Sequence, residues 1–395
     1  MTAITIIFYI TLFIVFYNYV GYGVLLYILV KIKYLVKKRP VFDPAFEPTA
    51  ALIIAAYNEA SFIEEKIKNT LSLDYPTGKL QIIFITDGSS DGTPRIIERY
   101  SQVTLLHKPE RAGKTAALNR AMETVQAEIA IFCDANTLLN KEAIRNIVKH
   151  YADVQTGGVA GEKKVIALDS ENAAGTEGIY WKYESALKKW DAQLYSVVGA
   201  AGELFSIRTK LYEPVEPGII LDDFVISLRV NLKGYRVAYA PDAYAMETPS
   251  GNMREEEKRK IRISAGGFQA IGKLGALLQF WKHPLLTWQY ISHRVLRWTL
   301  SPLSLPLLLV SNIILLLTSP NWFYMCVMAG QALFYVLAIA GFILSRRNIK
   351  HKAVYIPYYF LFMNIAVYQG FWRFIRKKQA VTWEKANRQT ATTAA

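Results

Sequence analysis

The sequence predicts an α/β domain with a mostly parallel sheet, preceded and followed by transmembrane and interface helices. Between about residues 45 and 263, short apolar runs alternate with amphipathic stretches, which is typical of parallel strands covered by helices. Long uncharged segments lie on both sides of this region, and they can cross a hydrocarbon core of about 30 Å. A chain of 395 residues has room for both parts.

The first uncharged segment, residues 4–30, predicts a membrane anchor. Its 27 residues include no Lys, Arg, Asp or Glu, and at about 1.5 Å per residue a helix of this length spans a bilayer. No basic residue precedes it and no small-x-small cleavage site follows, so we do not interpret it as a cleaved signal peptide. Five basic residues and no acid occur in 31–39, which places the following region in the cytoplasm by the positive-inside rule.

Further membrane segments are predicted near the C-terminus. Residues 298–345 form an uncharged block of 48 residues, broken near Pro320, and predict two spans joined by a tight turn. Residues 353–372 are just long enough for another span, but basic residues flank both ends, so either a re-entrant segment or a span that departs from the charge rule is expected. The aromatic and basic stretch 268–298 suits helices in the membrane interface, with ordinary amphipathic packing as the alternative.

The charge and the cysteines exclude several classes of protein. The net charge is +14, but residues 31–39, 254–297 and 346–388 hold 24 of the 46 basic residues and only 4 of the 32 acids. The remainder is therefore mildly acidic, and the excess of basic residues flanks the membrane segments, so we do not expect nucleic-acid binding. Two cysteines 193 positions apart and five scattered histidines exclude a disulfide framework, and any metal is expected on carboxylates. The predicted parts are an anchor at 1–34, the α/β domain at 45–263, interface helices at 264–298, a C-terminal membrane region at 299–376 and a tail at 377–395.

Four apolar runs are predicted as strands of the α/β domain. They cover residues 50–56, 81–86, 103–106 and 129–133. In such sheets ligands bind beyond the carboxyl ends of the strands, and polar residues lie there. One such residue alone is most often a helix cap or a turn former, but together they predict a divalent cation that bridges the phosphates of a nucleotide. The residues in question are Asn58, Glu59, Asp87, Asp91, Asp134 and Asn136.

Two local motifs suggest other sites. Asp87, Asp91 and Glu98 have the spacing of an EF-hand calcium loop, but a strand precedes them where an EF-hand has a helix. Residues 111–115 end like a phosphate-binding P-loop, but the position five before Gly113 is a lysine. Lys114 can still approach a phosphate as a point charge at the start of a helix, and a solvated lysine is the alternative.

The ordered set of motifs resembles that of family 2 glycosyltransferases. With membrane segments on both sides, the chain resembles the membrane-embedded branch that contains cellulose, hyaluronan and poly-N-acetylglucosamine synthases. The resemblance implies a GT-A fold and a nucleotide-sugar donor, usually a UDP-sugar. The segments that carry it are Ala56–Glu59, Asp87–Gly92, Gly113–Lys114, Asp134–Asn136, Gly202–Glu203 with Arg208, and Asp222–Asp223.

The resemblance also implies roles for these residues. A cation, Mg²⁺ or Mn²⁺, would stabilise the departing diphosphate, and Asn136 stands where the family has a second metal-binding acid. By position, Asn58, Glu59 and Asp87 would hold the base and ribose and Lys114 the phosphates. Asp134 would take part in donor binding as the first acid of the metal motif, and Asp134 with Asn136 would hold the metal.

Asp223 corresponds to the general base of the family. A sugar hydroxyl must lose its proton as it attacks the anomeric carbon, and a carboxylate within hydrogen-bond reach can accept that proton. Direct displacement would invert the anomeric centre. Asp222 and Arg262 are candidates for contact with the acceptor or a phosphate, and the structural alternative for Asp222–Asp223 is a helix N-terminus.

One departure from the family concerns the acceptor. Processive relatives carry Gln-x-x-Arg-Trp after the base, whereas residues 259–263 keep only Arg262. We therefore expect an inverting, metal-dependent hexosyltransferase in the cell (inner) membrane, multi-pass, with its site in the cytoplasm and either a glycan or a lipid-linked acceptor. Two alternatives from other classes stay open, a membrane-anchored NTPase and a non-catalytic nucleotide-sugar sensor.

Overall fold

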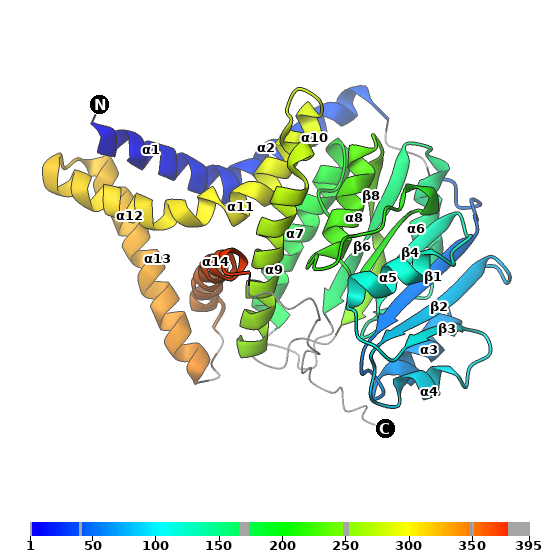
Figure 1. Cartoon of the computed structure of the whole chain (residues 1–395). Coiled ribbons are helices and arrows are strands. Elements are labelled where there is room, and N and C mark those ends of the chain that lie inside the picture. Colours follow the sequence, from blue (N-terminus) through cyan, green and yellow to red (C-terminus); the bar gives the residue numbers. More distant parts are fainter. Residues whose placement is uncertain are drawn as a thin grey trace.

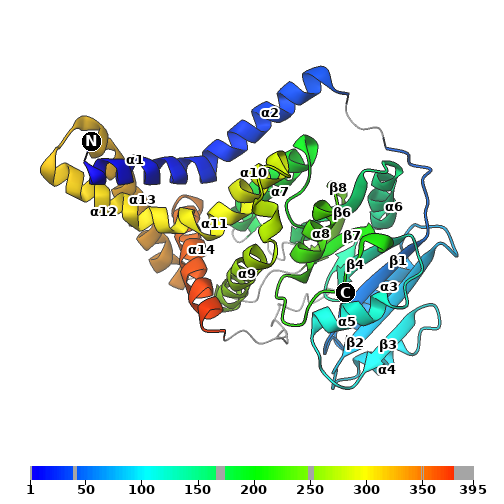
Figure 2. The same cartoon turned by 45° about the horizontal axis from the view of Figure 1, so that its top comes forward.

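The computed structural model describes residues 2–38, 42–165, 174–247, 253–347, 349 and 351–377. Figure 1 shows two parts: a sheet with helices on both faces, and a group of long helices that extends away from it. Helices α7 and α9 lie where the two parts meet, so the sheet domain borders directly on the group of long helices (Figures 1 and 2).

The sheet has eight strands in the order β3-β2-β1-β4-β7-β6-β8-β5. Strands β3, β2, β1 and β4 are mutually parallel, whereas β7 is antiparallel to β4 and β6. The four predicted strands are confirmed, and the sheet is mostly parallel and mixed, as predicted. The strands are β1 Ala50–Ala56, β2 Leu80–Asp87, β3 Thr104–Lys108, β4 Ile129–Asp134, β5 Leu138–Leu139, β6 Thr156–Val165, β7 Leu204–Arg208 and β8 Arg236–Glu247.

Both faces of the sheet are buried, which explains why the central strands are continuously apolar. Successive side chains of β1 point to opposite faces: Ile53 joins one apolar cluster with α5 and α8, and Ile54 joins the other with α3 and α6. The helices and short helical turns of this part are α3 Ile63–Leu71, α4 Thr93–Ile97, α5 Lys114–Met122, α6 Ala143–Val148, η2 Lys149–Ala152, α7 Ala174–Leu194, η3 Thr209–Leu211 and α8 Asp222–Leu232.

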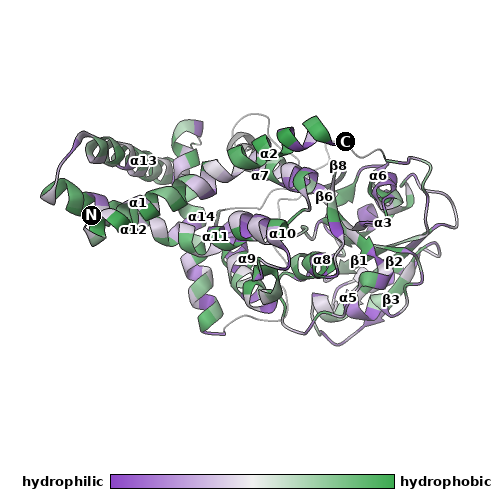
Figure 3. Ribbon diagram, turned by 90° about the horizontal axis from the view of Figure 1, so that it is seen from above, coloured by the Kyte–Doolittle hydropathy of each residue, from purple (hydrophilic) through white to green (hydrophobic). Residues whose placement is uncertain are grey.

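In the described part of the chain, three helices are long and apolar enough to cross a membrane. The first, Ala3–Val36, combines α1 Ala3–Phe16, a π-helical turn η1 Tyr17–Gly21 and α2 Tyr22–Val36. The others are α12 Leu300–Thr318 and α13 Trp322–Arg346, which flank the predicted turn near Pro320. Figure 3 shows the hydrophobic colouring of α1, α12 and α13. The predicted anchor and the predicted pair of spans therefore coincide with helices that are long and apolar enough to cross a membrane, as expected of a membrane protein.

The third predicted C-terminal segment is a helix, α14 Lys352–Ile375, but it is not among those three. It includes buried Asn364 and the polar Gln369, and it packs against α9 and α13. A Cβ atom on Gly370 would lie 2.5 Å from Ser264 Cβ, so the glycine lets α14 approach α9 closely. A membrane crossing by α14 therefore remains a prediction.

Helices between the sheet and the spans pack against the sheet domain. Tyr290 is fully buried in the apolar cluster on one face of the sheet, and the ring centroids of Trp298 and Phe224 are 5.4 Å apart. Amphipathic packing against the domain, the alternative interpretation of this stretch, therefore accounts for these two aromatic residues. The elements are α9 Met253–Lys273, η4 Gly275–Leu278, α10 Pro284–Tyr290, η5 Ile291–Val295 and α11 Leu296–Trp298. Helix α9 runs across residue 263, where the predicted α/β domain ends.

Candidate active site

The predicted site residues gather at the carboxyl ends of the parallel strands. Asp87 is the last residue of β2 and Asp134 the last residue of β4, and both strands pair with β1 between them. The register places Asp134 beside Ala55, and Thr86, the neighbour of Asp87, beside Ala56. The two acids therefore lie at one edge of the sheet, where ligands bind in folds of this kind.

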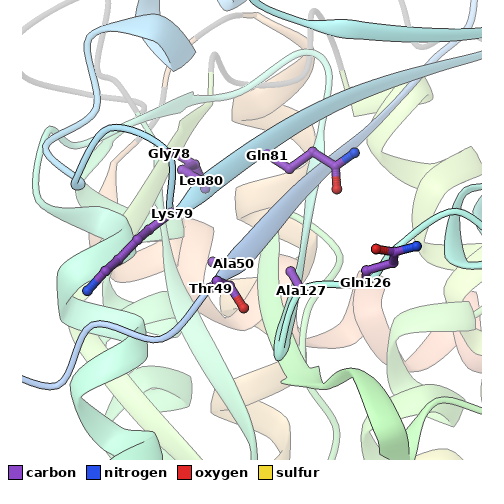
Figure 4. A pocket seen from close by; sticks show the side chains of 8 residues that line it. All are labelled: Thr49, Ala50, Gly78, Lys79, Leu80, Gln81, Gln126 and Ala127. Atoms are coloured by element: carbon purple, nitrogen blue, oxygen red, sulfur yellow. The ribbon is translucent and has the colours of Figure 1, made fainter.

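A shallow pocket lies at the opposite edge. Its lining, shown in Figure 4, comes from the starts of β1 and β2 and the turn before β4, including Thr49, Lys79 and Gln126. This lining contains no acid and none of the predicted site residues. Because it lies at the amino ends of the strands, we do not assign it to the active site.

Lys114 is the centre of a cluster of charges. It is the first residue of α5, and its Nζ lies 2.7 Å from Asp134 Oδ1 and 3.9 Å from Asp222 Oδ2. A Cβ atom on Gly202 would lie 3.4 Å from Lys114 Nζ and 3.2 Å from Asp223 Oδ2. Four distant segments of the chain thus bring one lysine and three carboxylates together. Lys114 is not the solvated surface lysine of the alternative interpretation.

The two neighbouring acids Asp222 and Asp223 open helix α8, as their structural alternative predicted. The helix start and the position in the charge cluster are compatible, because acids are favourable at a helix N-terminus. Burial and the neighbouring charge of Asp222 raise the pKa of Asp223 to about 7, although Lys114 opposes this shift. Burial lowers the pKa of Lys114, but Asp134, Asp222 and Asp223 outweigh it, so this pKa is raised above its ordinary value. Lys114 is therefore a stable cation, whereas Asp223 exchanges its proton near neutral pH.

Asp87 holds the loop before α5 and keeps one oxygen unpaired. Its Oδ2 accepts hydrogen bonds from the backbone N–H groups of Ala112, at 3.0 Å, and Gly113, at 2.6 Å. These amides therefore bind a carboxylate of the protein, which argues against the P-loop interpretation. Asp87 is 1% exposed, and its Oδ1 is buried without a hydrogen-bond partner among the residues described. A buried orphan acceptor is costly and is typical of a group that a ligand satisfies.

Asn58 connects the loops that follow β1 and β2. It has a φ of 54°, and its Oδ1 accepts a hydrogen bond from the Ser90 N–H at 2.8 Å. The Glu59 N–H donates to Thr93 Oγ1 at 2.9 Å. Asp91 accepts hydrogen bonds from the same turn, at the Thr93 N–H and hydroxyl and at the Ala60 N–H, so it shapes the loop. Strand β2 enters this loop, and the EF-hand interpretation is therefore wrong.

Sequence reasoning did not single out Tyr57 and Arg111 as a pair. The Arg111 guanidinium carbon lies 3.7 Å from the centroid of the Tyr57 ring, which is a cation–π contact. Gly88 has a φ of 69°, and a Cβ atom there would lie 2.6 Å from Arg111 Cβ. The sequence signal for this contact was the glycine of the Asp87–Gly88 dipeptide, because a side chain at position 88 would keep Arg111 from lying so close.

A buried ion-pair network supports the segment that carries Gly202. Lys163 Nζ lies 2.9 Å from Glu203 Oε1 and 2.7 Å from Glu247 Oε2, and Arg259 lies 3.0 Å from Glu203. Burial raises the pKa of Glu203, but Lys163 and Arg259 outweigh it and hold this pKa well below its ordinary value. Glu203 is therefore an anchored anion that fixes the segment beside Asp223. Sequence reasoning missed Lys163 and Glu247.

Two arginines singled out from the sequence lie in different places, Arg262 near the charge cluster and Arg208 away from it. Burial and Arg259 lower the pKa of Arg262, while the charges of Asp134, Asp222 and Asp223 oppose this shift. Arg262 on α9 is therefore close enough to the charge cluster to interact with its carboxylates. Arg208, in contrast, pairs with Ile129 at the start of β4 and donates hydrogen bonds to backbone carbonyls of Tyr151 and Thr156. Arg208 is thus structural and lies away from the carboxyl edge.

The donor set for a metal is small. In the described ranges, no three His, Cys, Asp or Glu side chains come together as a metal-binding group. Asp134 has a side chain that is 31% exposed, and Asn136 follows it two residues later. Mg²⁺ is commonly held by one or two protein oxygens with substrate phosphates completing the shell. The residues therefore fit a cation shared with a diphosphate, and they do not fit one held by the protein alone.

Comparisons with known proteins agree with this fold. Residues 51–215 match glycosyl transferase family 2. Over 250 residues the chain is 25% identical to the poly-β-1,6-N-acetyl-D-glucosamine synthase of Staphylococcus aureus, and this match covers 61% of the chain and 60% of the relative. It is 26% identical over 254 residues to the probable glycosyltransferase YdaM of Bacillus subtilis, covering 60% and 58%. The chain thus spans about three fifths of the curated relatives it matches.

Among solved structures, the chain is similar to the mannosyltransferase PcManGT from Pyrobaculum calidifontis in complex with GDP-Man and Mn²⁺. The TM-score is 0.71 at 22% identity, and the similarity covers 94% of this chain and 99% of that one. At this identity the likeness shows the fold. The family match identifies residues 51–215 as a family 2 glycosyltransferase domain, of the kind expected of a hexosyltransferase, and the structural likeness shows that its fold is GT-A.

Proposed function

We propose that this chain is an inverting glycosyltransferase that moves a sugar from a nucleotide-sugar to a hydroxyl group of an acceptor, at the cytoplasmic face of the membrane. One observation carries the proposal: Lys114, Asp134, Asp222 and Asp223 converge at the carboxyl edge of the sheet. The positive charge suits a diphosphate, and the adjacent ionisable acid suits proton transfer. Residues 45–263 would form the catalytic domain, followed by interface helices at 264–298, membrane helices at 299–376 and a tail at 377–395.

The donor would lie across the ends of β1, β2 and β4. The unpaired Oδ1 of Asp87 would accept a hydrogen bond from the base, and Asn58 and Glu59 would border the base and ribose. Lys114 would bind the diphosphate as a point charge. A divalent cation held by Asp134 and Asn136 would supply further charge stabilisation for the departing diphosphate.

Asp223 would act as the general base. Its pKa of about 7 matches the operating range of an efficient base near neutral pH. The hydroxyl oxygen of the acceptor forms a bond to the anomeric carbon, the bond from that carbon to the diphosphate breaks, and the proton passes to Asp223. The electron pair of the broken bond leaves with the nucleoside diphosphate. One direct displacement inverts the anomeric centre, and Lys114 offsets the negative charge that develops beside it.

A panel of donors tests the proposal. The full chain, reconstituted in nanodiscs, is incubated with UDP-, GDP- and dTDP-sugars, with and without Mg²⁺ or Mn²⁺, and release of the nucleoside diphosphate is measured. We expect one donor class to be consumed, only with a divalent cation. Phosphate release from ATP without any sugar would instead support the membrane-anchored NTPase, and UDP binding without turnover would support the sensor. The exposed Glu123, changed to Gln, serves as the control variant.

A further inference from the structure

A cavity connects the proposed general base with the membrane region. Its volume is about 460 Å³, and its lining includes Asp223 and Glu203 on the catalytic side. The lining continues through α7 and η5 to helix α14, and it includes Tyr19 from the first candidate span. An acceptor in this cavity would therefore reach Asp223 from the membrane side.

The part of the cavity formed by α14 is mainly apolar. Phe360, Met363 and Val367 line it. A glycan needs polar partners for its hydroxyl groups, and leaving them unpaired against an apolar wall is costly. An alkyl chain gains free energy from the same wall, by about fourfold in affinity for each buried methylene. The chemistry of this wall therefore favours a lipid chain.

One cation of the cavity lining, Lys188, has no partner among the described residues. Lys188 of α7 lines the cavity and is 4% exposed, and it forms no hydrogen bond or ion pair with any residue that the structure describes. Other basic residues of the lining are paired: Lys260 Nζ lies 3.3 Å from Glu256 Oε1, and Arg294 lies 2.9 Å from Glu184 Oε1. Lys188 therefore adds an unpaired positive charge to the wall of the cavity, where an anionic group of a ligand can pair with it.

We propose that the acceptor is an anionic membrane lipid, which rests on the proposed function. Its apolar chain would lie along Phe360, Met363 and Val367, a phosphate of its headgroup beside Lys188, and a headgroup hydroxyl beside Asp223. The hydroxyl is the group that attacks the donor, with the bonds and the proton as described above. The phosphate is not consumed, and its role is to position the headgroup between the membrane helices and the base.

Binding of a simple lipid phosphate tests the site without knowledge of the natural headgroup. The full chain in phosphatidylcholine nanodiscs is titrated with dodecyl phosphate, dodecanol or inorganic phosphate, with empty nanodiscs as the blank. We expect dodecyl phosphate to bind at least about tenfold more tightly than dodecanol, because a hydrogen bond between charged groups contributes at least this much affinity. Inorganic phosphate alone should bind at least about a hundredfold more weakly, because it buries no methylenes.

Matched variants locate the site. Lys188→Met should abolish the preference for dodecyl phosphate over dodecanol, whereas Lys189→Met, at the exposed neighbouring position, should keep it. Met363→Trp, which fills the cavity, should weaken both alkyl ligands by at least about tenfold. Ile365→Trp, on the exposed side of the same helix, should not. Unchanged UDP or GDP affinity in each variant shows that the domain is folded.

The outcomes separate this inference from the proposed function. If nucleotide-sugars are consumed but dodecyl phosphate and dodecanol bind alike, or if Lys188→Met keeps the preference, the lipid acceptor is refuted and the transferase proposal stands. If the lipid phosphate binds as expected but no nucleotide-sugar is consumed, the proposed function fails, and the cavity is not an acceptor site. Production of a long, water-soluble glycan without any lipid would also contradict the inference.

Discussion

The pH dependence of transfer should follow the ionisation of Asp223. With a pKa of about 7, its ionised fraction rises from about 3% to about 97% between pH 5.5 and pH 8.5, an increase of about 30-fold. Because the base must be ionised to accept a proton, kcat/KM should increase by about this factor over that range and then level off. The assay is nucleoside diphosphate release at limiting donor and acceptor, with protein folding checked at each pH.

Removing the neighbouring charge tests the cause of this pKa. Asp222 raises the pKa of Asp223, so Asp222→Asn should move the acid limb of the profile to lower pH. Glu123→Gln changes an exposed acid just after α5 and should leave the midpoint in place. A flat profile across this range, or a midpoint that Asp222→Asn leaves unchanged, would refute the reasoning that assigns proton transfer to Asp223.

Two further predictions concern nucleotide binding and stability. Asp87→Asn replaces the orphan acceptor Oδ1 by a donor while its other oxygen can still bind the loop, so UDP or GDP affinity should fall by about 10- to 100-fold at similar thermal stability; undiminished affinity would contradict the donor-site assignment. Glu184→Gln breaks the buried contacts with His293, Arg294 and Arg297 and should cost about 3–5 kcal/mol, measured as a lower Tm in nanodiscs. Burial raises the pKa of Glu184 but Arg294, His293 and Arg297 outweigh it, so this pKa lies well below its ordinary value, and the stabilisation should persist at neutral pH and be lost only in acid. An unchanged Tm would show that the ion pairs are not needed.

The sequence predicted the half of the sheet that is locally determined. Strands β1, β2 and β4 are continuously apolar and end in polar residues, and parallel strands bring such ends to one edge. This pattern was sufficient to predict that Asp87 and Asp134 lie at the same edge. The three candidate spans were equally visible, because their length and lack of charge require no knowledge of tertiary contacts.

Features that depend on distant partners could not be predicted. Lys163 lies in strand β6 and can be buried because two acids neutralise its charge. Glu203 directly precedes β7, and Glu247 is the last residue of β8. The contact of Arg111 with Tyr57 joins two loops more than fifty residues apart. The cavity beside Lys188 likewise requires α7 and α14 to be placed together, which neither hydropathy nor motif spacing specifies.

The central proposal is that Asp223 transfers the proton and does not bind the donor, and Asp223→Asn tests it most directly. The substitution keeps the shape of the side chain and removes its ability to act as a base, and loss of general base catalysis reduces the rate by about 10²- to 10⁴-fold. Transfer and nucleotide affinity are measured on the same preparation in nanodiscs. We predict that transfer falls by at least about a hundredfold while UDP or GDP affinity stays near that of the unmodified chain. Full transfer in the variant, or a parallel loss of nucleotide affinity, would contradict the assignment.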